Sequence, residues 1–262
     1  MLNEKYWNKR EQGEEIHELS AQEALAEAIE NDLLVEARQI IGQGKEAFVC
    51  WGKDKFGRSV AIKSYKLYRT THRGVIHGTH RTSPYEVIKH FAKLEFYKNL
   101  YAYKAGLPVP LPYKWAGYSY SMELIGSEEG PAPLLSDMNK NSFDDPTEIL
   151  EKCVDILHDM FQAQFVHGDF SEHNLLWHNE EMYVIDFLQS KRFALKDAVH
   201  RNSPLIPLTR AYRILRKDLN AILPYFSRLF RVTVNYEEVL EYILGDIKEK
   251  VDKELELISE VT

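Results

Sequence analysis

The stretch Phe165-Val-His-Gly-Asp-Phe-Ser-Glu-His-Asn-Leu-Leu176 places a short polar loop between two apolar runs, and Tyr183-Val-Ile-Asp-Phe187 follows soon after. His167, Asp169 and Asn174 have the spacing H-x-D-x-x-x-x-N, and Asp186 comes at the end of the second stretch. Phosphoryl transfer needs this set of groups: a carboxylate to take a hydroxyl proton, and an amide and a second carboxylate to hold Mg²⁺. Any one of these residues alone could lie in a polar turn between buried strands, but the ordered set favours a phosphotransfer site.

The composition is that of an ordinary globular protein. Its 262 residues, 44% hydrophobic and 28% charged, are enough for one large domain or for two lobes with their own cores. The apolar runs are too short to cross a bilayer, and Met1-Leu-Asn-Glu-Lys5 does not resemble a signal peptide, so we expect a cytoplasmic protein that does not contact membranes. Cys50 and Cys153 each lie in an apolar run, which predicts buried free thiols.

The charge is unevenly distributed. A formal net charge of -7 argues against general nucleic-acid coating, but two segments are strongly basic. Their basic residues are Lys63, Lys66, Arg69, Arg73 and Arg81 in the first, and Lys191, Arg192, Lys196, Arg201, Arg210, Arg213, Arg216 and Lys217 in the second. A local basic face can bind a phosphate backbone even on an acidic protein. A solvated face without a partner is the alternative.

The first lobe is predicted to begin with a helix and continue as strands. Residues 1–19 are polar and are expected to be frayed or docked as a short helix. Ser20-Ala-Gln-Glu23 has the pattern of a capping box, and the helix that follows should run to about Asn31 and pack on this lobe. Its apolar face is predicted to contain Ala24, Leu25, Ala28 and Ile29. Strands are expected at 33–41, 48–51 and 59–65, with a turn at 54–57.

Two features of this lobe suggest nucleotide binding. The loop Gly42-Gln-Gly-Lys-Glu-Ala47 could bring backbone N–H groups close to a phosphate, although an ordinary hairpin turn is equally consistent with it. Val60-Ala-Ile-Lys63 ends an apolar strand with a lysine, as in the kinase strand whose lysine contacts the α- and β-phosphates. Such a lysine needs a carboxylate partner, and the helix predicted from Pro84 to Ala105 offers Glu95, with Glu86 as the competitor. We expect this ion pair to be partly solvated, so that Lys63→Ala weakens ATP binding without unfolding the protein.

The remaining elements can be placed by the same signals. Residues 66–83 form a long loop rich in threonine and basic residues, which is either functional or an insertion of no consequence. Strands at 113–116 and 119–124 meet at Gly117, and Met122-Glu-Leu-Ile-Gly126 is the natural hinge. A helix capped by Asp145 should run to about Gln164. A second helix is expected at 208–223, before Pro224, and one last amphipathic helix from Leu240 to Ile258.

Taken together, these residues resemble the RIO family of atypical protein kinases over about residues 33–230. The resemblance rests on Gly42-Gln-Gly44-Lys-Glu-Ala47, Val166-His-Gly-Asp-Phe-Ser-Glu172-His-Asn174, Ile185-Asp-Phe-Leu-Gln189 and Leu215-Arg-Lys-Asp218-Leu-Asn220-Ala-Ile222. It implies an α+β, two-lobed protein-kinase-like fold with a small β-rich N-lobe (33–126) and a reduced helical C-lobe (127–262) without an activation segment. Residues 1–32 are a helical extension too short for the winged-helix domain of one RIO branch. Glycine at position 168 agrees with the expected lack of an activation segment, because kinases that are switched by phosphorylation of a loop carry arginine at this position.

The resemblance also implies roles for individual residues. Asp169 would be the base or orienter for the incoming hydroxyl, Asn174 and Asp186 would hold Mg²⁺, and Asp186 could carry an aspartyl-phosphate. Lys63, braced by Glu95, would steady the α- and β-phosphates of ATP. The nucleotide would be covered by Gly42, Gly44, Lys45, Glu46 and Ala47, and the hinge backbone would come from Glu123 and Ile125.

Three functions are therefore weighed. The first is an ATP- and Mg²⁺-dependent serine/threonine kinase or ATPase acting in maturation of the small ribosomal subunit, whose pre-ribosomal RNA and protein would contact the basic faces. The second is a small-molecule kinase of the aminoglycoside or choline type, against which Gly44-Lys-Glu-Ala47 and Gln189 argue. The third is a nucleotide-gated binding module without phosphotransfer, and the complete set of polar residues argues against it.

Overall fold

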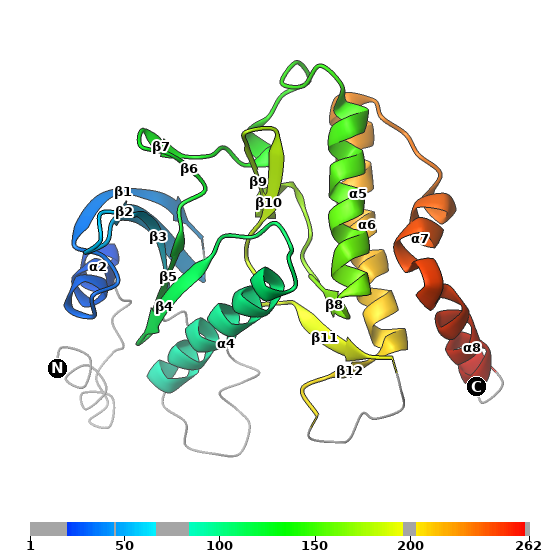
Figure 1. Ribbon diagram of the computed structural model, residues 1–262, viewed down its shortest axis with the longest axis horizontal. Helices are drawn as coiled ribbons and strands as arrows, with labels where there is room; N and C mark the ends of the chain where they lie inside the picture. The colour runs from blue at the N-terminus through cyan, green and yellow to red at the C-terminus, as the bar shows by residue number, and fades with distance from the viewer. Residues whose placement is uncertain (1–19, 45, 67–83, 196–202, 260–262) are drawn as a thin grey trace. The chain divides into compact units, whose positions relative to one another are not determined.

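A computed structural model describes residues 20–44, 46–66, 84–195 and 203–259 (Figure 1). The chain divides into two compact units, the first formed by Met1–Leu100 and Pro110–Pro131 and the second by Tyr101–Val109 and Ala132–Thr262. The first unit is built on an antiparallel sheet and the second is mainly helical.

The sheet of the first unit has the strand order β1-β2-β3-β5-β4, with every neighbouring pair antiparallel. The strands are β1 (Glu36–Gln43), β2 (Ala47–Lys53), β3 (Ser59–Tyr65), β4 (Pro112–Ala116) and β5 (Ser119–Glu123), and the short hairpin β6 (Gly126–Ser127) and β7 (Gly130–Pro131) follows. Asp54 forms the predicted turn between β2 and β3, because its Oδ1 accepts from the N–H groups of Phe56 and Arg58, both at 2.9 Å.

The two faces of this sheet have different coverings. Val60 and Ile62 point to the face that packs with Ala28 of helix α2 (Ala21–Glu30) and with the buried Leu33 and Leu34. The predicted capping box is confirmed, because the Ser20 hydroxyl accepts a hydrogen bond from the Glu23 N–H and the Glu23 carboxylate accepts one from the Ser20 N–H. The predicted apolar face of α2 is only partly right: Ala24 and Ala28 are buried, but Ile29 is exposed, because it lies on the side of the helix that turns away from the sheet.

The opposite face of the sheet receives helix α4 (Pro84–Lys104). Residues alternate along a strand, so Ala61, Lys63 and Tyr65 share this second face. Phe96 of α4 meets Tyr120 of β5 edge to face, with ring centroids 6.3 Å apart. The middle of α4 is thereby held against β5, the neighbour of the strand that carries Lys63.

The second unit is organised around helices α5 (Pro146–Gln162) and α6 (Leu208–Phe230), whose buried faces share one apolar core. The other helices are η1 (Leu135–Asp137), η2 (Glu172–Asn174), α7 (Tyr236–Leu244), η3 (Gly245–Ile247) and α8 (Lys248–Ser259). Short strands complete it: β8 (Phe165–Val166), β9 (Leu175–His178), β10 (Glu181–Val184), β11 (Lys191–Ala194) and β12 (Ile206–Pro207). As predicted, Asp145 caps α5, its Oδ1 accepting from the Thr147 N–H at 2.8 Å.

Two helix boundaries in this unit differ from the predictions. Helix α6 does not end before Pro224 but continues to Phe230. Proline removes one N–H from the helix, but burial of Tyr225 and Phe226 and ring contacts with Phe230 outweigh that loss. The last amphipathic segment is also not one helix, because Gly245 adopts a φ of +48° and separates α7 from α8.

The loop that was expected to cover a nucleotide is shorter than predicted. Gly42 lies inside β1, paired with Val49 of β2, so only residues 44–46 connect the strands. Lys45, residues 1–19 and nearly all of the 66–83 loop lie outside the described residues. Cys50 and Cys153 are buried free thiols, as predicted, and burial raises the pKa of Cys50 to about 11. In the described part of the chain, no helix combines the length and apolar character needed to span a membrane.

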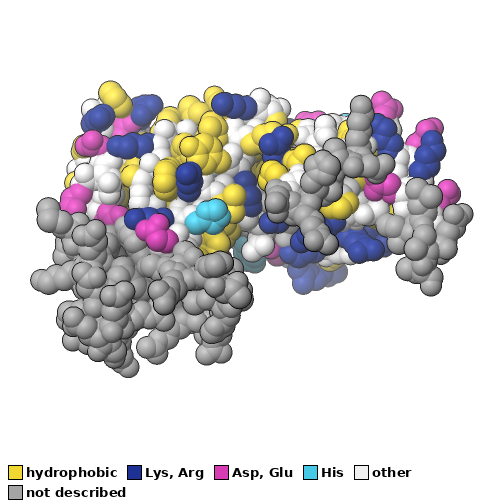
Figure 2. Space-filling view, turned by 90° about the horizontal axis from the view of Figure 1, so that it is seen from below, with side chains coloured by type: hydrophobic (Ala, Val, Ile, Leu, Met, Phe, Trp, Pro, Cys, Tyr) yellow, Lys and Arg dark blue, Asp and Glu magenta, His cyan; other side chains and the backbone are white. Residues whose placement is uncertain are grey.

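The outer side of α6 is basic. Arg210, Arg213, Arg216 and Lys217 are exposed, while Leu215 and Leu219 of the same helix are buried. Seen from below, Lys and Arg side chains gather on the second unit (Figure 2). The neighbouring strand β11 adds Lys191 and Arg192, and we call these six residues the α6 basic face. Lys196 and Arg201 of the predicted run are not among the described residues.

Candidate active site

Strand β8 leads into the polar loop 167–174, and His167 fixes the start of this loop. Its side chain is fully buried. Nδ1 lies 3.2 Å from the Asp169 N–H, which can only donate, and Nε2 lies 3.1 Å from the Ile185 carbonyl, which can only accept. The imidazole is therefore the neutral form with its proton on Nε2. Burial lowers the pKa of His167, against the opposing charges of Asp218 and Asp186, so that the neutral form is favoured.

Ile185 connects this loop to Asp186. Its carbonyl contacts His167, and its N–H donates to the Asn174 carbonyl at 3.0 Å. The residue before Asp186 is thus bonded to both ends of the polar loop. Asp186 itself has a φ of +66°, a left-handed conformation that aspartate tolerates better than most residues. Asp186 lies 12 residues after Asn174 in the sequence, and the segment that contains it is joined to the polar loop by these hydrogen bonds.

Asn174 could bind a magnesium ion through its amide oxygen, because its amide nitrogen is already used within the protein. Its Nδ2 donates to the Asp169 carbonyl oxygen at 2.8 Å and lies 3.3 Å from Asp169 Oδ2. With the amide nitrogen turned to Asp169, the amide oxygen points the other way. Mg²⁺ prefers hard oxygen ligands and keeps several waters, so one amide oxygen and the carboxylate of Asp186 suit it. Among the described residues, no group of three or more His, Cys, Asp or Glu side chains is placed so that it could hold a metal ion.

The peptide around Asp169 is held by helix α6. Asp218 is buried, and its carboxylate accepts from the Gly168 N–H at 2.9 Å and from the Phe170 N–H at 3.1 Å. Burial raises the pKa of Asp218, while His167 and these N–H groups act in the opposite direction. Gly168 has a φ of +83°, and a Cβ there would lie 3.1 Å from the Gln189 carbonyl oxygen. A glycine is thus required by the backbone itself.

In the first unit, Lys63 and Glu95 form the predicted pair. Lys63 Nζ lies 2.8 Å from Glu95 Oε1, whereas Glu86 pairs with Lys89 at the surface. The expectation of a partly solvated pair is wrong: Lys63 is 7% exposed and Glu95 is fully buried, because α4 packs directly on β3. Tyr65 adds a hydrogen bond from its hydroxyl to Glu95 Oε2. Strand β3 therefore supplies hydrogen-bond donors to both carboxylate oxygens of Glu95.

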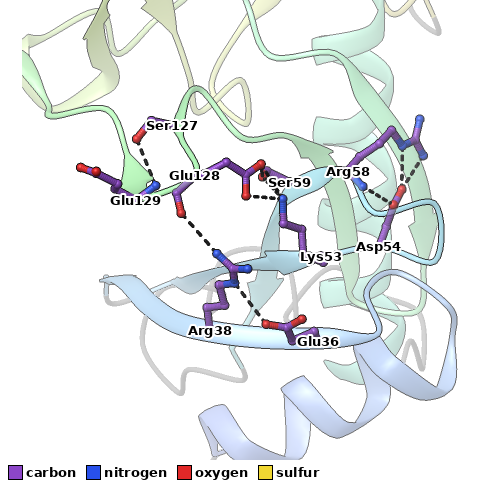
Figure 3. A network of polar contacts seen from close by, with 9 residues as sticks. All are labelled: Glu36, Arg38, Lys53, Asp54, Arg58, Ser59, Ser127, Glu128 and Glu129. Carbon is purple, nitrogen blue, oxygen red and sulfur yellow. Dashed lines mark hydrogen bonds and ion pairs between the residues drawn. The ribbon is translucent and has the colours of Figure 1, made fainter.

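The hinge segment is anchored in the same unit. The Glu123 N–H donates to the Leu111 carbonyl at 2.8 Å, and Ile125 is buried. In the β6–β7 hairpin that follows, Glu128 receives Lys53 Nζ at 2.6 Å on each carboxylate oxygen and Arg38 on its carbonyl oxygen (Figure 3). These contacts from β1 and β2 fix the hairpin against the sheet, and with it the chain that leaves the hinge.

The predicted site residues thus fall into two groups, each assembled within its own unit. Asp169, Asn174 and Asp186 belong to the second unit. Lys63, Glu95, Glu123, Ile125 and the described part of the 42–47 loop belong to the first. The sequence indicated no role in this site for Tyr65, Lys217 or Asp218, although Lys217 belongs to the second basic segment and Asp218 to one of the motifs of the resemblance. For Tyr65 a signal existed, since it follows Lys63 by two residues and shares its face of the strand.

Comparisons with known proteins identify the family of this chain. A model of the RIO domain family matches residues 49–239. The chain is 28% identical over 222 residues to human serine/threonine-protein kinase RIO1, covering 80% of this chain but 37% of that protein. It is 29% identical over 230 residues to the RIO-type serine/threonine-protein kinase Rio1 of Methanocaldococcus jannaschii, covering 84% of this chain and 72% of that protein.

A solved structure is similar as well. It is the Rio2 kinase-ADP/Mg²⁺-phosphoaspartate complex from Chaetomium thermophilum, with a TM-score of 0.60 at 20% identity, covering 92% of this chain and 76% of that one. This likeness confirms the predicted α+β, kinase-like fold. The chain spans well under two thirds of the human relative's length.

Proposed function

Since the chain belongs to the RIO domain family, we propose that it is an RIO-type serine/threonine kinase or ATPase that uses ATP with Mg²⁺. The observation that carries the proposal is the bonding of Ile185 to both His167 and Asn174, which joins Asp186 to the loop of Asp169. A hydroxyl-orienting carboxylate and two oxygen ligands are thereby supplied by one connected structure, as phosphoryl transfer requires.

The chain's own residues act mainly by position and charge. Asp169, with 55% of its side chain exposed, orients the incoming hydroxyl and takes its proton. Asn174 and Asp186 would hold Mg²⁺, which would supply positive charge against the phosphates. In the first unit, Lys63 is presented by Glu95 and Tyr65 and steadies the α- and β-phosphates. The 42–47 loop covers the nucleotide, and Glu123 and Ile125 offer backbone groups to adenine.

Asp186 has a second proposed role. The Rio2 kinase structure named above contains a phosphoaspartate with ADP and Mg²⁺. Asp186 is the candidate for such an acyl-phosphate in this chain, because it is the acidic residue that follows the strand β10 and lies next to Asn174 in space. In that case the γ-phosphoryl group passes to a carboxylate oxygen, ADP leaves, and water later releases phosphate. The protein would then act as an ATPase switch as much as a kinase.

The partner proposed for this enzyme is the maturing small ribosomal subunit, and its location is proposed to be the cytoplasm. The exposed α6 basic face supports the RNA part of this proposal, because clustered Lys and Arg bind phosphate backbones. Binding of the full chain to small-subunit RNA should fall steeply as salt rises from about 50 to 200 mM. A flat response would remove the electrostatic argument.

Single-turnover ATP hydrolysis tests the enzymatic proposal. Asp169→Asn and Asp186→Asn should each lower the rate by about 10²-fold or more. Asp144→Asn, a change at an exposed carboxylate outside the site, is the matched control and should turn over normally. Unchanged rates in both site variants would mean that the site is wrongly assigned. MgATP binding without any turnover in the unmodified protein would favour the binding module instead.

A further inference from the structure

The polar loop contains no lysine or arginine. Residues 168–174 read Gly-Asp-Phe-Ser-Glu-His-Asn, and the one side chain among them that could become positive, His173, is 71% exposed and faces Glu172 at 3.9 Å. Phosphoryl transfer benefits from fixed positive charge near the reacting groups. The sequence around Asp169 does not supply that charge.

Helix α6 brings a lysine to this position. Lys217 Nζ donates to the Gly168 carbonyl oxygen at 2.5 Å, and it lies 3.9 Å from Oδ1 of Asp169. The carbonyl is the one immediately before Asp169 in the chain. A single ammonium group therefore contacts both the backbone and the carboxylate of the proposed catalytic residue.

The next residue of the helix completes the arrangement. Asp218 accepts from the N–H groups of Gly168 and Phe170, so consecutive residues of α6 bind the acceptor and donor groups on both sides of Asp169. The two differ in exposure: Asp218 is buried, whereas the Lys217 side chain is 64% exposed. A buried anion thus sets the backbone, and a solvent-facing cation remains beside the carboxylate.

We propose that Lys217 is a positioning residue for phosphoryl transfer. It fixes the Gly168 carbonyl and pairs its charge with the Asp169 carboxylate, which sets the orientation in which that carboxylate meets the incoming hydroxyl. This inference rests on the proposed kinase or ATPase function and assigns to α6 the cation that the loop lacks.

If Lys217 had a purely structural role, its loss would lower the stability of the fold. Under the present proposal the fold should stay intact, because an exposed ion pair contributes only about 0–1 kcal/mol to stability. A misplaced catalytic group, by contrast, can cost about 10²-fold in rate even when the displacement is small. Because Lys217 lies beside Asp169, the residue proposed to orient the incoming hydroxyl, its loss should affect turnover more than ATP binding.

The test compares three variants of the full chain: Lys217→Met, Lys217→Arg and Lys152→Met. Lys152 is the matched control, a lysine of α5 paired with Glu148 at 3.5 Å. Steady-state kinetics of MgATP hydrolysis and thermal melting are measured for each. Lys217→Met should lower kcat by about 10-fold to 10²-fold with KM for ATP changed less than about 3-fold. Lys217→Arg should keep most of the activity, and Lys152→Met should match the unmodified protein.

Normal kcat in Lys217→Met, or an equal loss of kcat in Lys152→Met, would overturn the inference and leave the proposed function standing. Loss of kcat in both Lys217 variants together with a large fall in melting temperature would also overturn it, because Lys217 would then be structural. If the unmodified protein binds MgATP but never turns it over, the proposed function itself fails.

Discussion

The carboxylate of Asp218 accepts a 2.9 Å hydrogen bond from the N–H of Gly168, 50 residues earlier in the chain. A second bond, from Phe170 at 3.1 Å, makes this aspartate the internal support of the loop that carries Asp169. Asp218→Asn replaces one acceptor oxygen by an NH₂ group, which would then face an N–H donor. We expect a loss of about 1–3 kcal/mol of stability and, because Asp169 is displaced, a drop of about 10-fold or more in ATP turnover.

Urea unfolding and single-turnover hydrolysis measure the two effects of Asp218→Asn. The exposed Asp144→Asn serves as the control for removing one negative charge. Should Asp218→Asn unfold at the same urea concentration as the unmodified protein and hydrolyse ATP at the same rate, the support described here would be unimportant.

A second prediction concerns the buried pair of Lys63 and Glu95. Removing one partner of a buried pair leaves an uncompensated charge, at a cost of about 3–5 kcal/mol. We therefore expect Lys63→Ala to be strongly destabilised. The double variant Lys63→Met with Glu95→Gln removes both charges and keeps an acceptor for the Tyr65 hydroxyl, so it should recover most of the stability while ATP binding stays weak.

Thermal melting and calorimetric ATP titration separate these outcomes for the Lys63 and Glu95 variants. ATP binding restored along with stability in the double variant would show that Lys63 is structural and does not contact the nucleotide.

Tyr65 gives a third prediction. Its buried hydroxyl donates to Glu95 Oε2, while Lys63 Nζ donates to Oε1. Tyr65→Phe removes only the tyrosine hydroxyl and should cost about 1–2 kcal/mol of stability. It should also weaken ATP binding by a few-fold, because Lys63 is then held less firmly. Tyr103→Phe, at an exposed tyrosine of α4, is the control. Equal ATP affinities for the two variants would contradict this role.

The fourth prediction is a pH dependence caused by His167. Its pKa in the folded protein is lowered by burial, relative to the value of about 6.5 expected for the unfolded chain. Below that pH the unfolded chain binds the proton more readily, so stability should fall as pH drops from about 7 through 6.5 and below. His167→Gln lacks this group, and its stability should vary less over the same range.

Melting temperatures recorded every half unit between about pH 7.5 and 5.5 compare the two proteins. The pKa of Asp218 is raised in the folded state, so the contribution of this residue to stability increases as the pH falls toward the acid end of the range and below. Parallel curves for the unmodified protein and His167→Gln would show that His167 is not held neutral.

Much of this structure can be predicted from the sequence where local chemistry dictates it. Strand β3 matches the predicted 59–65 because its apolar residues and the Asp54 turn leave little choice. Glu95 could be preferred over Glu86 because a carboxylate in the first helical turn already has the helix dipole as a partner. Asp169, Asn174 and Asp186 could be singled out because phosphoryl transfer needs those groups and the protein-kinase signature has them in that order; their role in catalysis stays a prediction.

Other features depend on tertiary packing and could not be predicted locally. Pro224 is tolerated inside α6 because aromatic burial around it outweighs a lost hydrogen bond. The burial of Lys63 depends on how closely α4 packs on β3, which no sequence window encodes. Asp218 and Lys217 reach the loop only because α6 passes beside it, and nothing in the spacing of 50 residues predicts that contact.

The most direct measurement is a crystal structure of the full chain with Mg²⁺ and a non-hydrolysable ATP analogue. The account predicts the α- and β-phosphates on Lys63, the cation between Asn174 and Asp186, and the γ-phosphate facing Asp169. A nucleotide bound away from Lys63, or a cation with neither Asn174 nor Asp186 among its ligands, would contradict it.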